Sequence, residues 1–323
     1  MLHLTNGDCA VQALSRAGIA PEDILPWRDV LHEGPVPARL TLEELSAVRA
    51  QFLAQAGSGD FDDVRASFYE RDVRMAGSQA EDEVVCWFES DLYDQLQLLQ
   101  CLDWYADRSH RPARLTLVQA DRGPDGGFDA LGALEPWRVH ALLQGRVEVS
   151  SGQLDTAVRA WAAFRAAAPL SLERLWRAGE LASLPCLADA VVRLFEELPW
   201  ADTGLSRSER TALECLASQP STGAALFRAV RAREPRPFLG DAWFWRALEA
   251  LATGGQPLIA RQLSVATRGI EAAVLSLTPV GRAVLEGRLV WAPEIERWSG
   301  GTRIWRHGSV WRWDGARQCV IQG

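Results

Sequence analysis

The stretch EVVCWFESDLYDQLQLLQCLDWYAD, residues 83–107, contains the alternation that decides the fold. The run EVVCWF at 83–88 is almost entirely apolar, as in a strand buried on both faces of a parallel sheet. From Ser90 onward the apolar residues recur at helical spacing, which predicts an amphipathic helix over 90–107 with Ser90 as its N-cap. The apolar run RLTLVQ at 114–119 predicts the next strand, and a strand, a helix and a strand in this order favour parallel strands.

The beginning of the chain repeats this alternation. LHLTN at 2–6 predicts a short strand, and the following DCAVQALSRAG predicts a helix with Asp8 at its N-cap and Gly18 at its end. ILPWRDVL at 24–31 is a further extended segment, which Pro26 restricts to an edge or irregular strand.

Two helices are expected between the second and third strands. Thr41 and Glu44 have the spacing of a capping box for a helix that ends near Ala56, and a second helix is expected over 60–76. Strands that alternate with helices indicate an α/β fold with helices on the faces of a parallel sheet. Residues 1–125 therefore predict a Rossmann-like α/β domain.

The remaining sequence predicts two further parts, since a chain of 323 residues is too long for one ordinary core. Residues 126–204 have helical periodicity and predict a helical segment that completes the first domain or bridges to the second. Residues 205–323 predict three helices, two strands (QLSVAT and AVLSLT) and a short helix, the order of a winged-helix-like α+β domain. The tail RIWRHGSVWRWD predicts a hairpin that turns at His307 and Gly308.

Composition excludes several kinds of chemistry. The chain has no lysine and a single asparagine, Asn6, and all 34 basic residues are arginine. Without lysine there is no Schiff base for pyridoxal phosphate and no P-loop nucleotide site of the Walker type. The glycine pattern after the first strand, NGDCAV at 6–11, does not match a dinucleotide fingerprint either. The six cysteines lack C-x-x-C spacing and are expected to be small buried side chains.

Hydropathy and charge suggest the setting in which the protein works. No apolar run approaches the roughly 18–20 residues that span a bilayer, and the first residues lack the regions of a signal peptide. We therefore expect a cytoplasmic protein without membrane contact, of undetermined oligomeric state. The net charge is −8, yet residues 205–323 contain 16 arginines against ten aspartates and glutamates. This basic part is expected to have its own partner or to dock on the acidic part.

Polar side chains follow the three predicted strands at the edge where open parallel sheets bind ligands. The candidate catalytic residues, as an acid–base set or as ligands of a divalent metal, are Asp8, His32 and Glu33. The candidate ligand-binding residues are Asn6, Gly7, Arg28, Glu89 and Asp91. Arg28 would bind an anionic substrate, Gly7 would let a ligand approach the backbone, and Asn6 would offer a donor and an acceptor.

A structural interpretation of the same residues remains open. Asp8 and Ser90 would then be helix N-caps, Asn6 would stabilise a turn, and His32 would lie in a solvated loop with Glu33.

Two functions are compatible with these patterns. The first is binding of a small polar or anionic ligand, with metal-assisted hydrolysis or transfer as the closest reaction class. The second is a ligand-responsive regulator, in which the winged-helix-like domain binds DNA through Arg231 and Arg246, with Phe244 and Trp245 near the groove. In the alternative interpretation of that domain, Trp243 and Phe244 pack into its own core.

Several motifs together resemble known bacterial sequence families. LTNGD, LPWRDVLHEGPVP and WFESDLYDQLQLLQ resemble the family catalogued as domain of unknown function 1835. GDAWFWRAL, LTPVGRAVLEG and ERWSGGT resemble its companion C-terminal family, numbered 3658. The resemblance implies a two-part bacterial protein whose polar motifs are a shared signature, and it implies no reaction. The family pattern often has histidine at the position of Ser90, so a second imidazole is missing here.

Overall fold

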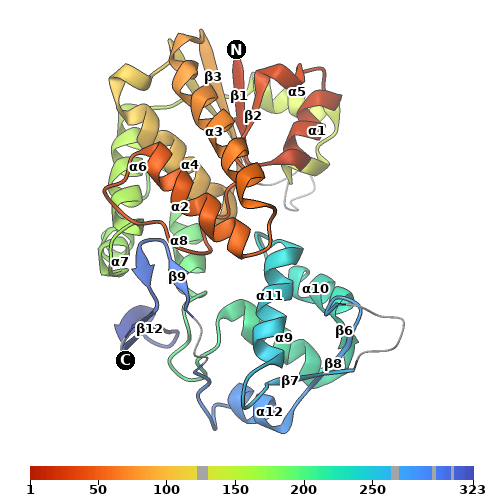
Figure 1. Ribbon diagram of the computed structural model, residues 1–323. Coiled ribbons are helices and arrows are strands. Elements are labelled where there is room, and N and C mark those ends of the chain that lie inside the picture. Colours follow the sequence, from red (N-terminus) through yellow and green to blue (C-terminus); the bar gives the residue numbers. More distant parts are fainter. Residues whose placement is uncertain (122–129, 263–268, 293–295, 307–308) are drawn as a thin grey trace. The chain divides into compact units, whose positions relative to one another are not determined.

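The computed structural model describes residues 1–121, 130–262, 269–292, 296–306 and 309–323 (Figure 1). The chain forms two compact units. The first contains Met1–Val191 with Arg297–Arg303, and the second contains Val192–Glu296 with Ile304–Gly323. In the described part of the chain, every helix is too short or too polar to cross a membrane.

The first unit is built on a five-stranded, mostly parallel sheet with the strand order β2-β1-β3-β4-β5. The strands are β1 Leu2–Thr5, β2 Ile24–Pro26, β3 Glu83–Glu89, β4 Arg114–Ala120 and β5 Val147–Glu148. β1 pairs in parallel with β2 and β3, β3 pairs in parallel with β4, and the short β5 is antiparallel to β4. The predicted α/β class is confirmed.

Helices cover both faces of this sheet (Figure 1). The helices of this unit are α1 Asp8–Arg16, α2 Leu42–Gln55, α3 Phe61–Gly77, α4 Leu92–Ala106, α5 Pro136–Gln144, α6 Ser151–Phe164 and α7 Leu170–Arg177. α8, Leu187–Phe195, runs across the boundary between the two units. α1 and α5 bury apolar side chains against β3 and β4 on one face, while α4 packs between β3 and α6 on the other.

Two predicted N-caps are wrong by one residue. α4 begins after Asp91, whose side chain accepts a hydrogen bond from the Asp94 N–H, whereas the Ser90 hydroxyl donates to Asp121. α1 begins at Asp8 with Gly7 at the N-cap position and no side-chain cap. The predicted capping box of Thr41 and Glu44 is confirmed at the start of α2.

α4 is a buried helix, and the prediction of an amphipathic one is wrong. Its polar residues Gln95, Gln97 and Gln100 are buried along with its leucines. Each of these glutamines is hydrogen-bonded: Gln95 donates to the carbonyl of Glu89, Gln97 donates to a further backbone carbonyl, and Gln100 accepts from a tryptophan N–H. Hydrogen-bond partners on neighbouring elements offset the free-energy cost of burying these polar side chains.

The predicted burial of the cysteines is correct for Cys86, Cys101 and Cys186. It is wrong for Cys9, which is exposed in the first turn of α1.

Two glycines of the motif ERWSGGT, Gly300 and Gly301, pack closely against other segments of the first unit. Gly300 has φ +60, and its carbonyl accepts a hydrogen bond from the Val36 N–H. A Cβ on Gly301 would lie 1.9 Å from the carbonyl oxygen of Arg165, so only glycine allows this approach to the end of α6. The flanking strands β9 Trp298–Ser299 and β10 Thr302–Arg303 form a small antiparallel pair.

The second unit contains helices and a three-stranded antiparallel sheet of order β6-β8-β7. The helices are α9 Arg207–Ser218, α10 Gly223–Arg231, α11 Asp241–Ala252 and α12 Pro279–Leu285. The strands are β6 Ser221–Thr222, β7 Ile259–Gln262 and β8 Val274–Leu277. Most of the predicted strand QLSVAT lies outside the described residues.

The tail of the chain forms a second small sheet of order β11-β12-β13. Its strands are β11 Trp305–Arg306, β12 Ser309–Asp314 and β13 Cys319–Gln322. β11 and β12 pair antiparallel as predicted, although the turn at 307–308 lies outside the described residues. Trp313 is fully buried and stacks on Phe195, with 5.7 Å between the ring centroids.

Replacement of Ser206 by alanine is expected to lower the free energy of unfolding by about 1–2 kcal/mol. Ser206 is 1% exposed, and its hydroxyl accepts from the Glu209 N–H at 3.2 Å in the capping box of α9. Urea denaturation measures the loss. Ser218→Ala at the exposed end of the same helix is the control, with an expected change within about 0.5 kcal/mol. Equal effects of the two variants would contradict the role of the cap.

Candidate functional site

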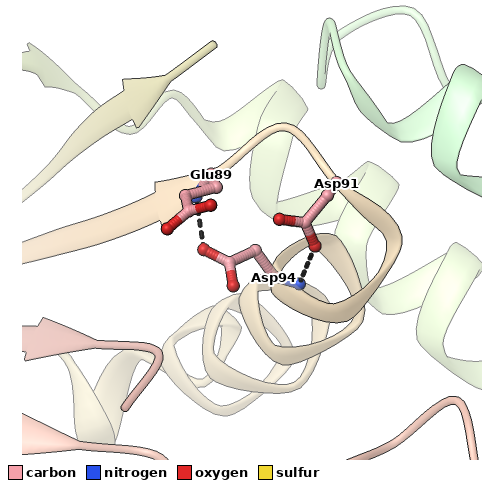
Figure 2. A group of neighbouring side chains, drawn as sticks. All are labelled: Glu89, Asp91 and Asp94. Carbon is pink, nitrogen blue, oxygen red and sulfur yellow. Dashed lines mark hydrogen bonds between the residues drawn. The ribbon is translucent and has the colours of Figure 1, made fainter. Parts of the chain in front are cut away.

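Three carboxylates converge where β3 ends and α4 begins. Glu89 is the last residue of β3, Asp91 caps α4, and Asp94 lies in the first turn of that helix (Figure 2). One oxygen of each carboxylate lies within 4.8 Å of the others. The side chains are buried, with exposed fractions of 7%, 3% and 0%. We call Glu89, Asp91 and Asp94 the carboxylate cluster.

Local backbone geometry holds the cluster in place. The Asp94 N–H donates to Asp91 Oδ1 at 3.1 Å, and the Glu89 N–H donates to the carboxylate of Asp94 (Figure 2). The side-chain amide of Gln95 donates to the Glu89 carbonyl at 2.7 Å. Because the N-terminus of a helix carries partial positive charge, it favours carboxylates in this position.

Asn6 reaches the carboxylate cluster from the neighbouring strand. β1 lies beside β3 with Thr5 opposite Trp87, which brings the end of β1 to the end of β3. Asn6 Nδ2 is 2.9 and 3.1 Å from the two carboxylate oxygens of Asp94 and 3.3 Å from Glu89 Oε1. The single asparagine of the chain therefore donates to two of the three carboxylates.

Burial and mutual repulsion favour protons on the carboxylate cluster. Desolvation, followed by the charge of Glu89, raises the pKa of Asp91 well above its ordinary value. The pKa of Asp94 is also raised well above its ordinary value, by desolvation and then by the charges of Asp91 and Glu89. The hydrogen bond from Asn6 opposes the shift at Asp94. A bound cation would remove the same repulsion.

The oxygen atoms of the carboxylate cluster suit a hard divalent cation. Carboxylate oxygens are among the ligands that Mg²⁺, Ca²⁺ and Mn²⁺ prefer. The three carboxylates could therefore hold such an ion.

Asp8 and Arg28 form an exposed pair beside Asn6. Arg28 Nη2 lies 2.7 Å from Asp8 Oδ1, with the two side chains 46% and 66% exposed. Arg28 has φ +52, which is uncommon for a residue other than glycine, and its N–H donates to the Asn6 carbonyl at 3.1 Å. The predicted anion-binding arginine thus lies next to the end of β1.

His32 and Glu33 lie in the loop that follows β2. His32 is buried with its ring edge-on to Tyr93 of α4, at 6.0 Å between centroids. The hydroxyl of Tyr93 donates to the Asn6 carbonyl at 3.4 Å. The Glu33 carbonyl accepts from Arg49 at 2.7 Å.

The predicted site residues therefore separate into two sets. Asn6, Glu89 and Asp91 gather around the carboxylate cluster, together with Asp94, which the sequence analysis missed. Because Asp94 is three residues after the N-cap Asp91, its place in the first turn of α4, close to Asp91, could have been predicted from the sequence. Among the described residues, the group of three side chains close enough to share a metal ion is the carboxylate cluster. Asp8, His32 and Glu33 do not belong to it. Their catalytic role stays a prediction.

The candidate DNA-binding residues lie in the second unit. Arg231 at the end of α10 and Arg246 on α11 are exposed, and the Arg246 guanidinium lies 5.4 Å from the centre of the Trp243 ring. Trp243 and Phe244 are buried, and Phe244 belongs to the core of this unit. Phe244 is thus unable to face a groove, and the core interpretation is confirmed for Phe244.

No protein-family model matches the chain, and no match was found among curated proteins.

Proposed function

We propose that the first unit binds a divalent cation at the carboxylate cluster and a small anionic ligand beside it, at the carboxyl ends of the parallel strands. The observation that carries this proposal is the convergence of three buried carboxylates on ligand-like distances. Desolvation and the repulsion between neighbouring carboxylates raise the pKa values of Asp91 and Asp94, and a bound cation would relieve that repulsion.

Sheet topology supports this location. A Rossmann-like, doubly wound sheet is part of this proposal, and it is supported by the order β2-β1-β3-β4, in which β2 lies on one side of β1 and β3 and β4 lie on the other. Ligands bind such sheets at the point where this direction reverses, outside the carboxyl ends of the strands. Asn6 directly follows β1 and Glu89 is the last residue of β3, so both lie at that point.

The residues around the cation would have different roles. Glu89, Asp91 and Asp94 would hold it, and Asn6 would orient two of these carboxylates. Arg28, released from Asp8, would bind the anionic ligand, while Gly7 leaves its backbone accessible. A bound divalent cation would supply charge neutralisation and Lewis acidity for hydrolysis or transfer. His32 and Glu33 are the proposed acid–base residues of that reaction.

Calorimetric titration of the purified chain with Mg²⁺, Ca²⁺ and Mn²⁺ tests the proposal. Asp91→Asn is expected to weaken cation binding by about tenfold or more, equivalent to about 1.4 kcal/mol. Asparagine keeps the helix cap while removing one charge, so the fold is expected to survive. Asp60→Asn makes the same substitution at the exposed cap of α3 and should leave binding unchanged. Absence of saturable binding to the wild-type chain would refute the cation site.

A second proposed function, a DNA-binding regulator, is supported by the arginines of the second unit. Arg228 and Arg231 on α10 and the following Arg233 are exposed close together in sequence. Duplex DNA binding that weakens with salt and with the pair Arg231→Ala and Arg246→Ala would support a DNA-binding regulator. Lack of duplex binding at low salt would exclude it.

A further inference from the structure

The first unit has a cavity that is separate from the carboxylate cluster. It has a volume of about 570 Å³ and lies between α2, α3 and the segment from Trp104 to His110 at the end of α4. None of the carboxylates Glu89, Asp91 and Asp94 lines it.

One wall of the cavity is aromatic. The rings of Trp104 and His110 are stacked, with 3.8 Å between centroids and 6° between planes. A hydrogen-bonding contact of 3.1 Å between His110 Nδ1 and the Trp104 carbonyl fixes this arrangement. Tyr69 and Val73, two further lining residues on α3, are 64% and 52% exposed. Large exposed apolar side chains around a hollow are typical of a surface that something covers.

A fixed acceptor lies among these apolar side chains. Asp72 is 13% exposed and accepts from Arg71 at 2.8 Å and from the Ser46 hydroxyl at 2.5 Å. Arg71 is itself held between the rings of Trp27 and Phe68, at 4.1 and 4.2 Å from their centres. The donors described for Asp72 are Arg71 Nε, Arg71 Nη2 and the Ser46 hydroxyl, and a carboxylate offers about four acceptor positions. Asp72 therefore retains capacity for a donor supplied from the cavity.

The size of the cavity selects the class of occupant. Small-molecule sites measure roughly 300–1,000 Å³ and are mostly apolar with a few placed polar groups. One turn of an α-helix, about 10–12 Å wide and 5.4 Å long, would already fill this volume, so a helical partner would leave most of its length outside.

We propose that this cavity binds a small planar aromatic molecule whose hydroxyl or amine group donates to Asp72. The ring is expected to lie against the Trp104–His110 stack and under Tyr69 and Val73. This site is independent of the proposed cation site, and its test requires no metal.

The test uses 2-naphthol and 2-methoxynaphthalene, which share a ring system but differ in the hydroxyl donor. We expect the wild-type chain to bind 2-naphthol about tenfold more tightly than the methoxy compound in titrations followed by ligand-observed NMR. Asp72→Asn is expected to reduce this preference. Since Asp72→Asn also breaks the pair with Arg71, a second variant that leaves this pair intact is needed.

Val73→Arg supplies that second variant, because it places a long charged side chain at the exposed rim. It is expected to weaken 2-naphthol binding about tenfold or more. Val158→Arg, the same change at an exposed position of α6, is the control and should bind as the wild type does. Failure of 2-naphthol to bind up to its solubility limit, or binding that is unchanged in Val73→Arg, would overturn the proposal.

Discussion

Replacement of Arg49 by methionine is expected to lower the free energy of unfolding by about 3–5 kcal/mol. Arg49 is 0% exposed and Asp29 is 1% exposed, and their charged groups meet at 2.9 Å. Methionine fills part of the space of the arginine stem but leaves the Asp29 carboxylate buried without its cation. Urea denaturation of the full chain measures the loss.

Arg49 also forms hydrogen bonds with backbone carbonyls of the loop after β2. Its guanidinium donates to the carbonyls of Val30, Glu33 and Pro35 at 2.8, 2.7 and 3.3 Å. A neutral side chain would remove this donor from all three carbonyls, although the Val30 carbonyl would keep the Glu33 N–H, and this loss adds to the cost of the lost ion pair. Because this loop contains His32, the variant should also disturb the contact of His32 with Tyr93.

The matched control for Arg49→Met is Arg28→Met. Arg28 pairs with Asp8 at an even shorter distance, 2.7 Å, but both side chains are largely exposed. Exposed pairs contribute about 0–1 kcal/mol, so a loss within that range is expected. If the two variants proved equally destabilised, burial would not be the source of the effect.

Local signals in the sequence identified the elements well. The apolar run of β3 and the capping box at Thr41 were predicted correctly, because both depend on residues a few positions apart. The cap of α4 was misassigned because Ser90 and Asp91 are adjacent and both are good N-cap residues. Only the backbone geometry of the turn separates them.

Long-range pairing decided what the sequence analysis missed. Asn6 reaches Asp94, a residue 88 positions away, because β1 lies beside β3, whereas Asp94 itself joins Glu89 and Asp91 through the local turn from β3 into α4. Arg49 has the pattern of an ordinary helical arginine until Asp29 is placed against it. Likewise, the glutamines of α4 indicated a solvent-facing side, and only their partners on other elements explain their burial.

In a cation-free buffer, we compare the free energy of unfolding of the wild-type chain with that of Asp91→Asn. The wild-type value minus the Asp91→Asn value is expected to be lower at pH 8 than at pH 5. The folded-state pKa of Asp91 is raised above its ordinary value by burial and by Glu89, so the folded state binds a proton that the unfolded state has released. Stability therefore falls as pH rises from about 4 through the folded-state pKa. Asp94 contributes in the same direction. Asp91→Asn removes one charge from the carboxylate cluster and should flatten this part of the profile.

The difference in free energy of unfolding between the wild type and Asp91→Asn separates the effect of the carboxylate cluster from that of other titrating groups. Burial raises the pKa of Asp103 to about 6, which also costs stability as pH rises, but that loss ends near pH 6. The buried His3, whose pKa is lowered to about 4, acts in the opposite direction because stability is lost as pH falls toward that value. Both groups are common to the wild type and Asp91→Asn, so their contributions cancel in the comparison.

Addition of a divalent cation then completes the prediction. A ligand that binds only the folded state stabilises it by RT ln(1 + [L]/Kd), so Mn²⁺ at pH 8 should raise the urea midpoint of the wild type. Asp91→Asn should gain much less, whereas Asp60→Asn should gain as much as the wild type. A stability difference between wild type and Asp91→Asn that stays constant from pH 5 to pH 8, with equal gains from Mn²⁺, would mean that the cluster carries no titrating charge and binds no cation. The three carboxylates would then serve only to cap α4 and to join it to β1.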